Sequence, residues 1–430
     1  MKSRKDIFTA AVLGSDVIRA VAATFEDPQN ASSGMEILGY ASVPSRKVRR
    51  DEPIAPEIVS EELSQALREC WEQAGCEEVP RAQSLVISGD YIHTQTLTDE
   101  IELDEQQPVT FQDQEALIHQ ITVKADNADL RIPGETILPC GLLARGFQLD
   151  DGPVLFSAIG RTGAKLSCES IYLTAETTTI ECVQRIAQNA LPPQCSFNHM
   201  IYAPVAVSSG IFPPTQLDEP QGLVVDLGAG MTSYHIPFKW GAPCCGQIPI
   251  GIDHAANDLS IALGLRFETG RDILKKMEEL RCSLDVKRDG AVRRLTIKEG
   301  PEDTTMVCGS AVEIIVAARI EELFQLLKQR LEDEGVNAWL GNEILLTGVG
   351  ATLPQVTMLA EKVFPGRHFR VATPYGVRPL PHQTLTPDDA ILLGALRAGC
   401  LEHLLQLQNQ VKDLGVLGKV KSFWDSLRDW

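Results

Sequence analysis

The chain has 430 residues, of which 44% are hydrophobic and 23% charged, a composition typical of a soluble protein with two or more domains. Its net charge of −19 and isoelectric point near 4.9 argue against nucleic-acid binding, which needs a basic surface. Its eleven cysteines include no CxxC pair and its N-terminal sequence has no secretory h-region, so we expect neither disulfides nor a zinc site, in a reducing cytoplasm.

The N-terminal region predicts a hairpin, a helix and a buried strand. Two extended runs, FTAAVL and VIRAVAATF, flank a turn at residues 14–16. A basic loop, PSRKVRR, follows at residues 44–50. A helix with one apolar face is expected from Val59 to Ala74, ending at Gly75, and SLVISG at residues 84–89 is typical of a buried strand.

Residues 90–170 have a different character. They contain an acidic run at 98–105, a helix candidate at 111–123 and short strand-like runs such as GETILP and GPVLFSAI. This mixture predicts a small α+β insertion. The first pattern resumes at Ile171, with a helix expected at 175–190 and a strand-like run, MIYAPVAV, after it.

A second glycine-tipped hairpin is expected at residues 222–238 (GLVVDLGAGMTSYHIPF). Its first run ends in Asp226, and the tip contains Gly228 and Gly230. Glycine lets backbone N–H groups approach an anion, and an aspartate at a strand end can hold hydrated Mg²⁺. A solvated turn with an incidental acid explains the same residues, so this stretch alone leaves both interpretations open.

The remaining sequence predicts a second set of helices and strands. IPIGIDHAANDLSIALGL joins a strand end to a helix, and VKRDGAVRRLTIKEG is β-prone. NEILLTGVG predicts a strand that runs into a glycine turn, and Thr386 begins a well-capped final helix. Further helices are expected at 268–280, 310–334 and 353–364.

The last sixteen residues, GVLGKVKSFWDSLRDW, predict an amphipathic helix. Its apolar face would consist of Val416, Leu417, Val420, Phe423, Trp424, Leu427 and Trp430. A final helix docked on its own domain would show the same periodicity. Two tryptophans and a phenylalanine in eight residues, after the separating Gly415 and Gly418, favour binding to a membrane interface.

Together, the two glycine hairpins, the TGVG turn before a helix and the insertion after SLVISG resemble the actin, sugar-kinase and heat-shock chaperone ATPase superfamily. Within it the chain is most similar to the bacterial cell-division family FtsA, on the stretches VPSRKVRR, VVDLGAG, ILLTGVGATLPQV, DDAILLGAL and the aromatic tail. The resemblance implies an α/β actin-like fold of two domains with a central cleft. The usual subdomain 1B would be absent and an α+β subdomain 1C inserted in the first domain.

The resemblance also implies domain boundaries. Subdomain 1A would comprise 1–87 and 171–219, subdomain 1C 88–170, subdomain 2A 220–252 and 341–403, and subdomain 2B 253–340, followed by a linker at 404–414 and the amphipathic helix at 415–430.

By the same resemblance, the cleft would bind ATP with Mg²⁺. Gly14 and Ser15 would lie in the first phosphate hairpin, Asp226, Gly228, Gly230 and Thr232 in the second, Gly348 and Gly350 in the adenosine motif, and Lys275 on the purine side, with Asp226 holding Mg²⁺ through water. The chain departs from the family pattern at Val12, Asp16, Val17, Ser233 and Val349. With one metal-side acid left, we expect weak or degenerate ATP binding, hydrolysis that is slow or absent and no catalytic residue.

The function implied is that of an adaptor. It would polymerise like actin and tether FtsZ to the cytoplasmic face of the inner membrane at the division site. FtsZ would dock around residues 253–340, and the insertion would contact other subunits or divisome proteins. Two alternatives stay open: a PilM-like pilus-assembly adaptor, and a kinase of the superfamily, for which the isolated His235, His254 and His382 offer no convincing base.

Overall fold

A computed structural model describes residues 7–411 except 81, 126–131, 139–141, 194, 214–215, 218–221, 240, 286–293 and 299–303. The side chains of 82, 338 and 405–411 are also outside the description. The predicted membrane-binding residues at 415–430 therefore lie outside the described residues. No helix in the described part is long and apolar enough to cross a membrane.

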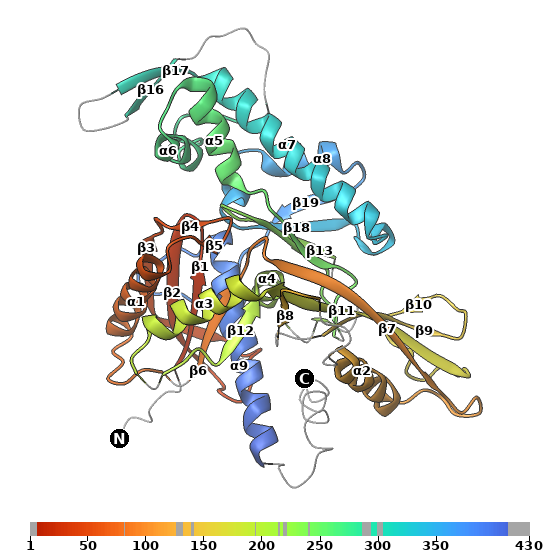
Figure 1. Cartoon of the computed structure of the whole chain (residues 1–430). Coiled ribbons are helices and arrows are strands. Elements are labelled where there is room, and N and C mark those ends of the chain that lie inside the picture. Colours follow the sequence, from red (N-terminus) through yellow and green to blue (C-terminus); the bar gives the residue numbers. More distant parts are fainter. Residues whose placement is uncertain are drawn as a thin grey trace.

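Two sheets of similar topology form the two domains (Figure 1). The first has the order β12-β6-β1-β2-β3-β20, with strands β1 (Phe8–Leu13), β2 (Val17–Phe25), β3 (Met35–Pro44), β6 (Ala82–Ile87), β12 (His199–Tyr202) and β20 (Val377–Arg378). The second has the order β15-β14-β13-β18-β19, with β13 (Leu223–Leu227), β14 (Thr232–His235), β15 (Cys245–Ile248), β18 (Glu343–Thr347) and β19 (His368–Val371). Each contains an antiparallel hairpin, β1–β2 or β13–β14, whose first strand also pairs with a parallel neighbour, as the two predicted hairpins require.

Helices cover both faces of the first sheet, and for this reason β1 is buried along its whole length. Helices α1 (Pro56–Gln73) and α3 (Thr177–Ala190) share one hydrophobic core with it. Helices α4 (Ala203–Ile211) and α9 (Ala390–Val411) form the core on the other side. A two-stranded ribbon, β4 (Val48–Arg49) and β5 (Glu52–Pro53), carries the basic loop.

The second domain consists of its sheet and the helices above it in Figure 1. These are α5 (Ile252–Leu263), α6 (Phe267–Lys275), α7 (Gly309–Asp333) and α8 (Val356–Val363), with the ribbon β16 (Arg294–Lys298) and β17 (Thr304–Cys308). Short 3₁₀ turns lie at η3 (Asn337–Trp339), η4 (Val349–Thr352) and η5 (Pro387–Asp389). The apolar stripe of α7, the long helix predicted at 310–334, is buried in this domain's core.

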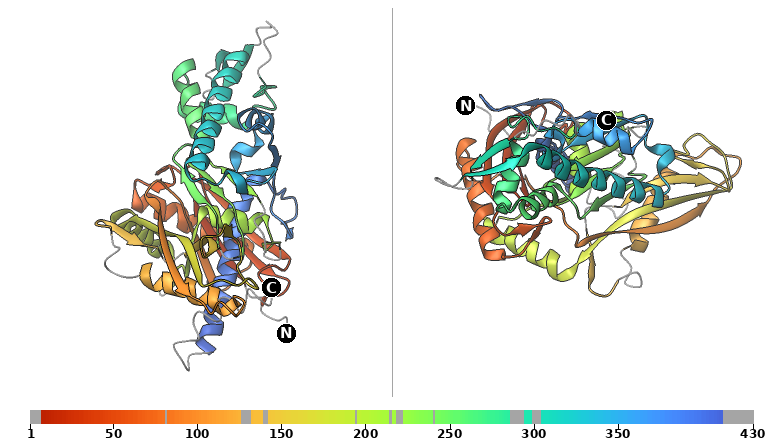
Figure 2. Two further views of the ribbon diagram at one scale, coloured as in Figure 1. Left: turned by 90° about the vertical axis from the view of Figure 1, so that its right-hand side faces the viewer. Right: turned by 90° about the horizontal axis from the view of Figure 1, so that it is seen from above.

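The insertion is a five-stranded sheet with one helix, as predicted. It contains β7 (Ile92–Glu102), α2 (Phe111–Ala125), β8 (Glu135–Ile137), β9 (Leu143–Leu149), β10 (Val154–Leu155) and β11 (Lys165–Glu176). Because β11 is one continuous strand of 12 residues, the insertion ends at Glu176 and not at the predicted residue 170. Figure 2 shows that it extends to the side of the molecule opposite α1.

The insertion is attached to the second domain through a joint we call the insertion joint. The ring of Phe156 lies 5.4 Å from the rings of both Phe238 and Trp339, centroid to centroid. The backbones of Ala144 and Gly241 form a β-bridge, and the Ala242 N–H donates to the Ala144 carbonyl at 2.9 Å. The insertion thus packs on the second domain here, while Ile171 and Leu173 of β11 belong to the core of the first domain.

Three other expectations differ from the structure. The strand-like run after Met200 turns into α4 at Ala203, because an apolar run fits a buried helix as well as a strand and Pro204 occupies the first helical turn. Residues 377–378 and α9 pack on the first sheet, whereas 341–403 was assigned to subdomain 2A. Helix α9 also continues to Val411, through most of the predicted linker at 404–414.

Candidate functional site

A cleft of about 880 Å³ separates the basic loop of the first domain from α5 and α6 of the second. Its volume is in the range of ligand-binding sites. Its lining mixes charges of both signs and includes Ser15, Asp16, Arg46, Arg49, Arg50, Gly230, Asp253, His254, Glu268, Arg271, Asp272 and Lys275.

The tip of the first hairpin is closed by a carboxylate that the sequence did not indicate. The Ser15 N–H and hydroxyl donate to Asp51 Oδ1 at 3.2 and 2.8 Å, and the Asp51 N–H donates to Ser15 Oγ at 2.9 Å. Ser88 donates to the other carboxylate oxygen at 2.7 Å. Burial raises the pKa of Asp51, and the hydrogen bonds from Ser88 and Ser15 oppose that rise.

The tip of the second hairpin is occupied by the start of α5. The Ile252 and Asp253 N–H groups donate to the Gly228 and Ala229 carbonyls at 3.0 and 2.9 Å. These are N-terminal N–H groups of the helix, which would otherwise lack partners or bind an anion. Thr232 is fully buried, and its hydroxyl donates to the Ile250 carbonyl at 2.7 Å. Its oxygen therefore faces the protein interior.

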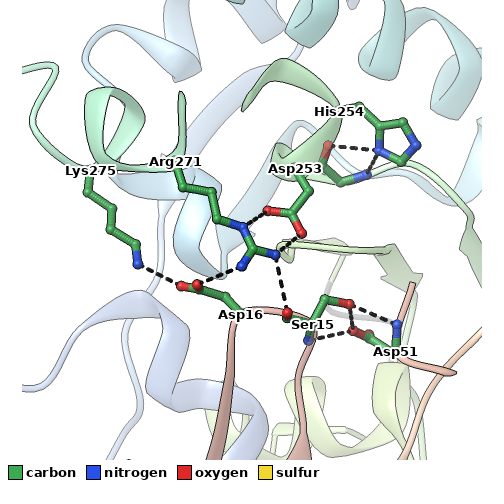
Figure 3. Close-up of polar contacts among 8 residues, drawn as sticks. Ser15, Asp16, Asp51, Asp253, His254, Arg271 and Lys275 are labelled. Carbon is green, nitrogen blue, oxygen red and sulfur yellow. Dashed lines mark hydrogen bonds and ion pairs between the residues drawn. The ribbon is translucent and has the colours of Figure 1, made fainter. Parts of the chain in front are cut away.

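Ion pairs cross the cleft between the two domains (Figure 3). The Arg271 guanidinium holds Asp253 with two hydrogen bonds, one of them Nε to Oδ1 at 2.7 Å, and donates to Asp16 Oδ1 at 3.2 Å and to the Ser15 carbonyl at 3.1 Å. Lys275 Nζ lies 2.8 Å from Asp16 Oδ2. We call this cluster the cleft latch. Lys275, predicted on the purine side, thus contacts the first hairpin.

Asp226, the predicted Mg²⁺ ligand, lies at the end of β13 and is 7% exposed. Burial, together with the nearby Asp388 carboxylate, raises its pKa to about 8. At pH 7 the protonated form predominates, which is a poor partner for a hydrated cation. Gly348 is needed here, since a Cβ on it would overlap Asp226 Oδ1. The described residues contain no group of three or more histidine, cysteine or acidic side chains placed to hold a metal ion.

The predicted adenosine motif lines a much smaller cavity. About 120 Å³ is enclosed by Asp16, Ala229, Ile252, Asp253, Arg271, Leu274, Lys275, Val349, Thr352 and Leu353. Small-molecule sites usually have about 300–1,000 Å³. Gly350 packs against Leu227 and Ile252 and leaves no space for a side chain. In this arrangement, the residues present do not fit a magnesium triphosphate nucleotide bound at the hairpin tips.

Comparison with known proteins extends over nearly the whole chain. No protein-family model matches the sequence. The cell division protein FtsA of Pseudomonas aeruginosa is 21% identical over 409 residues, 95% of this chain and 92% of that protein. FtsA of Borreliella burgdorferi is 20% identical, with 97% of each chain aligned, and FtsA of Bacillus subtilis is 20% identical, with 89% of this chain and 82% of that protein aligned. This chain is a divergent relative of the FtsA proteins.

A solved structure agrees with an FtsA-like architecture. The PilM-PilN type IV pilus biogenesis complex has a chain that superimposes with a TM-score of 0.60, covering 93% of this chain and 99% of that one, at 13% identity. At that identity the match shows the fold alone. The actin-like two-domain fold predicted from the sequence is confirmed.

Sequence reasoning placed the FtsA-like hairpins but missed the residues that fill the space between them. Asp51, Asp253 and Arg271 were not selected, although Asp253 and Arg271 line the cleft and Asp51 holds the hairpin tip beside it. A signal was present for Arg271, because Arg271 and Lys275 share the polar face of an amphipathic helix. None existed for Asp51, whose role depends on contacts across 36 positions of sequence.

Three histidines were considered as possible bases. His235 is buried and lies 2.7 Å from the Ser208 hydroxyl, and burial lowers its pKa to about 3. His254 receives a hydrogen bond from the Gly251 N–H at 3.2 Å at the start of α5. His382 lies in an exposed turn with a φ of 70°. No general base for a kinase of the superfamily emerges among these three.

Proposed function

We propose that this chain is an FtsA-type adaptor of the bacterial cell-division machinery. It polymerises like actin and tethers FtsZ to the cytoplasmic face of the inner membrane at the division site. The FtsA relatives that align with 95% and 97% of the chain are the observation that carries this proposal. The confirmed actin-like fold supports self-association into protofilaments.

The contact surfaces of the chain are assigned by the same similarity to FtsA. FtsZ docks on the region 253–340, which comprises α5, α6 and α7 of the second domain. The insertion, which carries the acidic run along β7, contacts neighbouring subunits or other divisome proteins. The helix at 415–430 lies in the membrane interface with Val416, Leu417, Val420, Phe423, Trp424, Leu427 and Trp430 in the apolar layer. One such helix binds weakly, so several copies in a polymer give firm attachment.

Nucleotide has a subordinate role in this proposal. ATP with Mg²⁺ binds weakly, and its hydrolysis is slow or absent. The occupied hairpin tips, the raised pKa of Asp226 and the 120 Å³ cavity beside Val349 support this part of the proposal. Phosphate release measured with Mg²⁺ and saturating ATP tests it, and turnover at the rate of an ordinary kinase would contradict it.

The adaptor function is tested by co-sedimentation of FtsZ filaments with anionic vesicles. We expect the full chain to carry FtsZ into the vesicle pellet. A chain ending at Leu414 and Trp424→Glu should both fail, because a charge on the apolar face opposes insertion. Ser426→Glu adds the same charge on the polar face and should retain binding. Equal FtsZ recovery with the full chain and the truncated chain would refute tethering by the tail.

A PilM-like pilus-assembly adaptor is the second candidate, favoured by the superposition on the PilM-PilN complex. The aromatic helix at 415–430 distinguishes the two, because it belongs to the FtsA pattern. Failure of the full chain to bind FtsZ filaments in solution, without vesicles, would favour this second candidate.

A further inference from the structure

The tip of the first hairpin already binds an anion, and the anion is part of the chain. Three donors converge on the Asp51 carboxylate: the Ser15 N–H, the Ser15 hydroxyl and the Ser88 hydroxyl, at 3.2, 2.8 and 2.7 Å. Figure 3 shows the two contacts from Ser15. Convergent backbone and hydroxyl donors at a tight turn are the arrangement that binds phosphate. The hairpin is therefore a working anion site with an internal ligand.

The backbone around Asp51 is folded so that its side chain enters this site. Arg50 and Asp51 have φ values of 49° and 59°. Non-glycine residues rarely adopt this left-handed conformation, and aspartate is among those that tolerate it best. The N–H of Asp51 also donates back to Ser15 Oγ at 2.9 Å, so the two residues hold each other through reciprocal hydrogen bonds.

The tip of the second hairpin packs closely against Ser15 and Arg50. A Cβ on Gly230 would overlap the Ser15 hydroxyl and come within 2.8 Å of the Arg50 Cα. Gln247 extends the network across the domains, because its Nε2 donates to Ser88 at 2.7 Å and to Ser233 at 3.0 Å. While Asp51 stays in place, a phosphate would meet its negative charge and find the Ser15 donors taken.

We propose that Asp51 is the resident ligand of the phosphate site, a carboxylate in the position of a nucleotide polyphosphate. It ties the tip of the first hairpin to Ser88, which Gln247 links to the second domain, and it excludes the phosphates of any nucleotide that enters the cleft. This inference rests on the proposed function in one respect: it explains the weak ATP binding that we propose for the adaptor. Once the Asp51 carboxylate is removed, the Ser15 and Ser88 donors still favour a polyphosphate.

The test compares nucleotide binding by the full chain and by Asp51→Gly. Glycine adopts a φ of 59° without strain and empties the site. With MANT-ATP and Mg²⁺ as the probe, we expect Asp51→Gly to bind at least tenfold more tightly than the natural chain. Inorganic tripolyphosphate should displace the probe from the variant, because the new contacts are made to phosphate.

Asp150→Gly is the matched control. Asp150 also has a positive φ, 49°, and its carboxylate accepts hydrogen bonds from the Ala164 and Lys165 N–H groups at 3.0 and 2.9 Å, but it lies in the insertion. It should leave MANT-ATP binding unchanged. If Asp51→Gly does not fold, judged by its thermal melt, Asp51→Asn removes the charge with little change of shape and should tighten binding at least threefold.

The outcomes separate this inference from the proposed function. Equal, weak MANT-ATP binding by the natural chain and a folded Asp51 variant overturns the role of Asp51 and leaves weak nucleotide binding intact. Tighter binding that tripolyphosphate does not reverse also overturns it. Tight binding by the natural chain contradicts both the resident carboxylate and the weak ATP binding of the adaptor, whereas tethering of FtsZ is decided separately by vesicle sedimentation.

Discussion

Two of the contacts between the domains of this FtsA-like chain, the cleft latch and the insertion joint, differ in chemistry. The cleft latch consists of ion pairs among Asp16, Asp253, Arg271 and Lys275. The insertion joint consists of stacked rings at Phe156 and a backbone bridge at Gly241. Partly exposed ion pairs contribute about 0–1 kcal/mol each and weaken in salt, whereas aromatic packing does not. We therefore expect the cleft latch to be the weaker and more salt-sensitive of the two joints.

Breaking the insertion joint should have the largest effect. In Gly241→Val, the new Cβ would lie within 2.6 Å of the Ala144 carbonyl oxygen, at a φ of 155°. Overpacking and backbone strain together predict a loss of about 4 kcal/mol in the free energy of unfolding, measured by urea denaturation.

Gly160→Val controls for strain alone in that measurement. Gly160 lies in the insertion and also has a positive φ, of 83°, but nothing lies within 4 Å of a Cβ placed there. It should lose about 1–2 kcal/mol. Equal losses in the two variants would show that the contact between Gly241 and Ala144 contributes nothing to the joint.

The second prediction concerns Asp226, which lies below the cleft with a pKa raised from 3.8 to about 8. Between these values the unfolded chain has released this proton and the folded chain retains it, so stability falls as the pH rises. From pH 5 to pH 7 the natural chain should lose about 2–3 kcal/mol relative to Asp226→Asn, which does not titrate. Urea denaturation at the two pH values measures it, and parallel stabilities would contradict the raised pKa.

The third and smallest effect sharpens the comparison at the cleft latch. Arg271→Ala should cost about 1 kcal/mol in low salt and less in 0.5 M NaCl, because the pairs are partly exposed. Hydrogen exchange should accelerate in residues 13–17 and 44–52, which face α6.

Arg319→Ala is the matched control for Arg271. Arg319 also holds an aspartate with two hydrogen bonds, to Asp258 at 2.6 and 3.1 Å, but both residues belong to the second domain. It should leave exchange in the first domain unchanged. Faster hydrogen exchange of the first domain in both variants would mean that the cleft latch does not specifically protect the residues that face α6.

The sequence predicted the parts of the fold that short-range patterns encode. The two hairpins, the long α7 and the cap at Thr386 follow from extended apolar runs around a turn, helical periodicity and capping residues, and Thr386 does form a capping box with Asp389. Helix α4 was mistaken for a strand because a short apolar run has no decisive period.

The site was predicted less completely, for a physical reason. Glycines such as Gly228 and Gly348 indicate tight turns, so the tip of the second hairpin and the turn after β18 could be located. Asp51 is one acid in an exposed, charged loop, and only the tertiary fold brings it to Ser15. What fills a cleft is decided by long-range contacts, which a single sequence does not display.

The C-terminal segment packs back onto the first sheet, and this determines when the first domain can finish folding. Strand β20 pairs with β3 at the edge of that sheet, and α9 buries the face formed by β1 and β6. These contacts join opposite ends of the chain, which slows folding. During synthesis, the N-terminal strands leave the ribosome long before α9 is made, so the apolar face that α9 covers stays exposed until then. The first domain to be made is therefore the last to be finished.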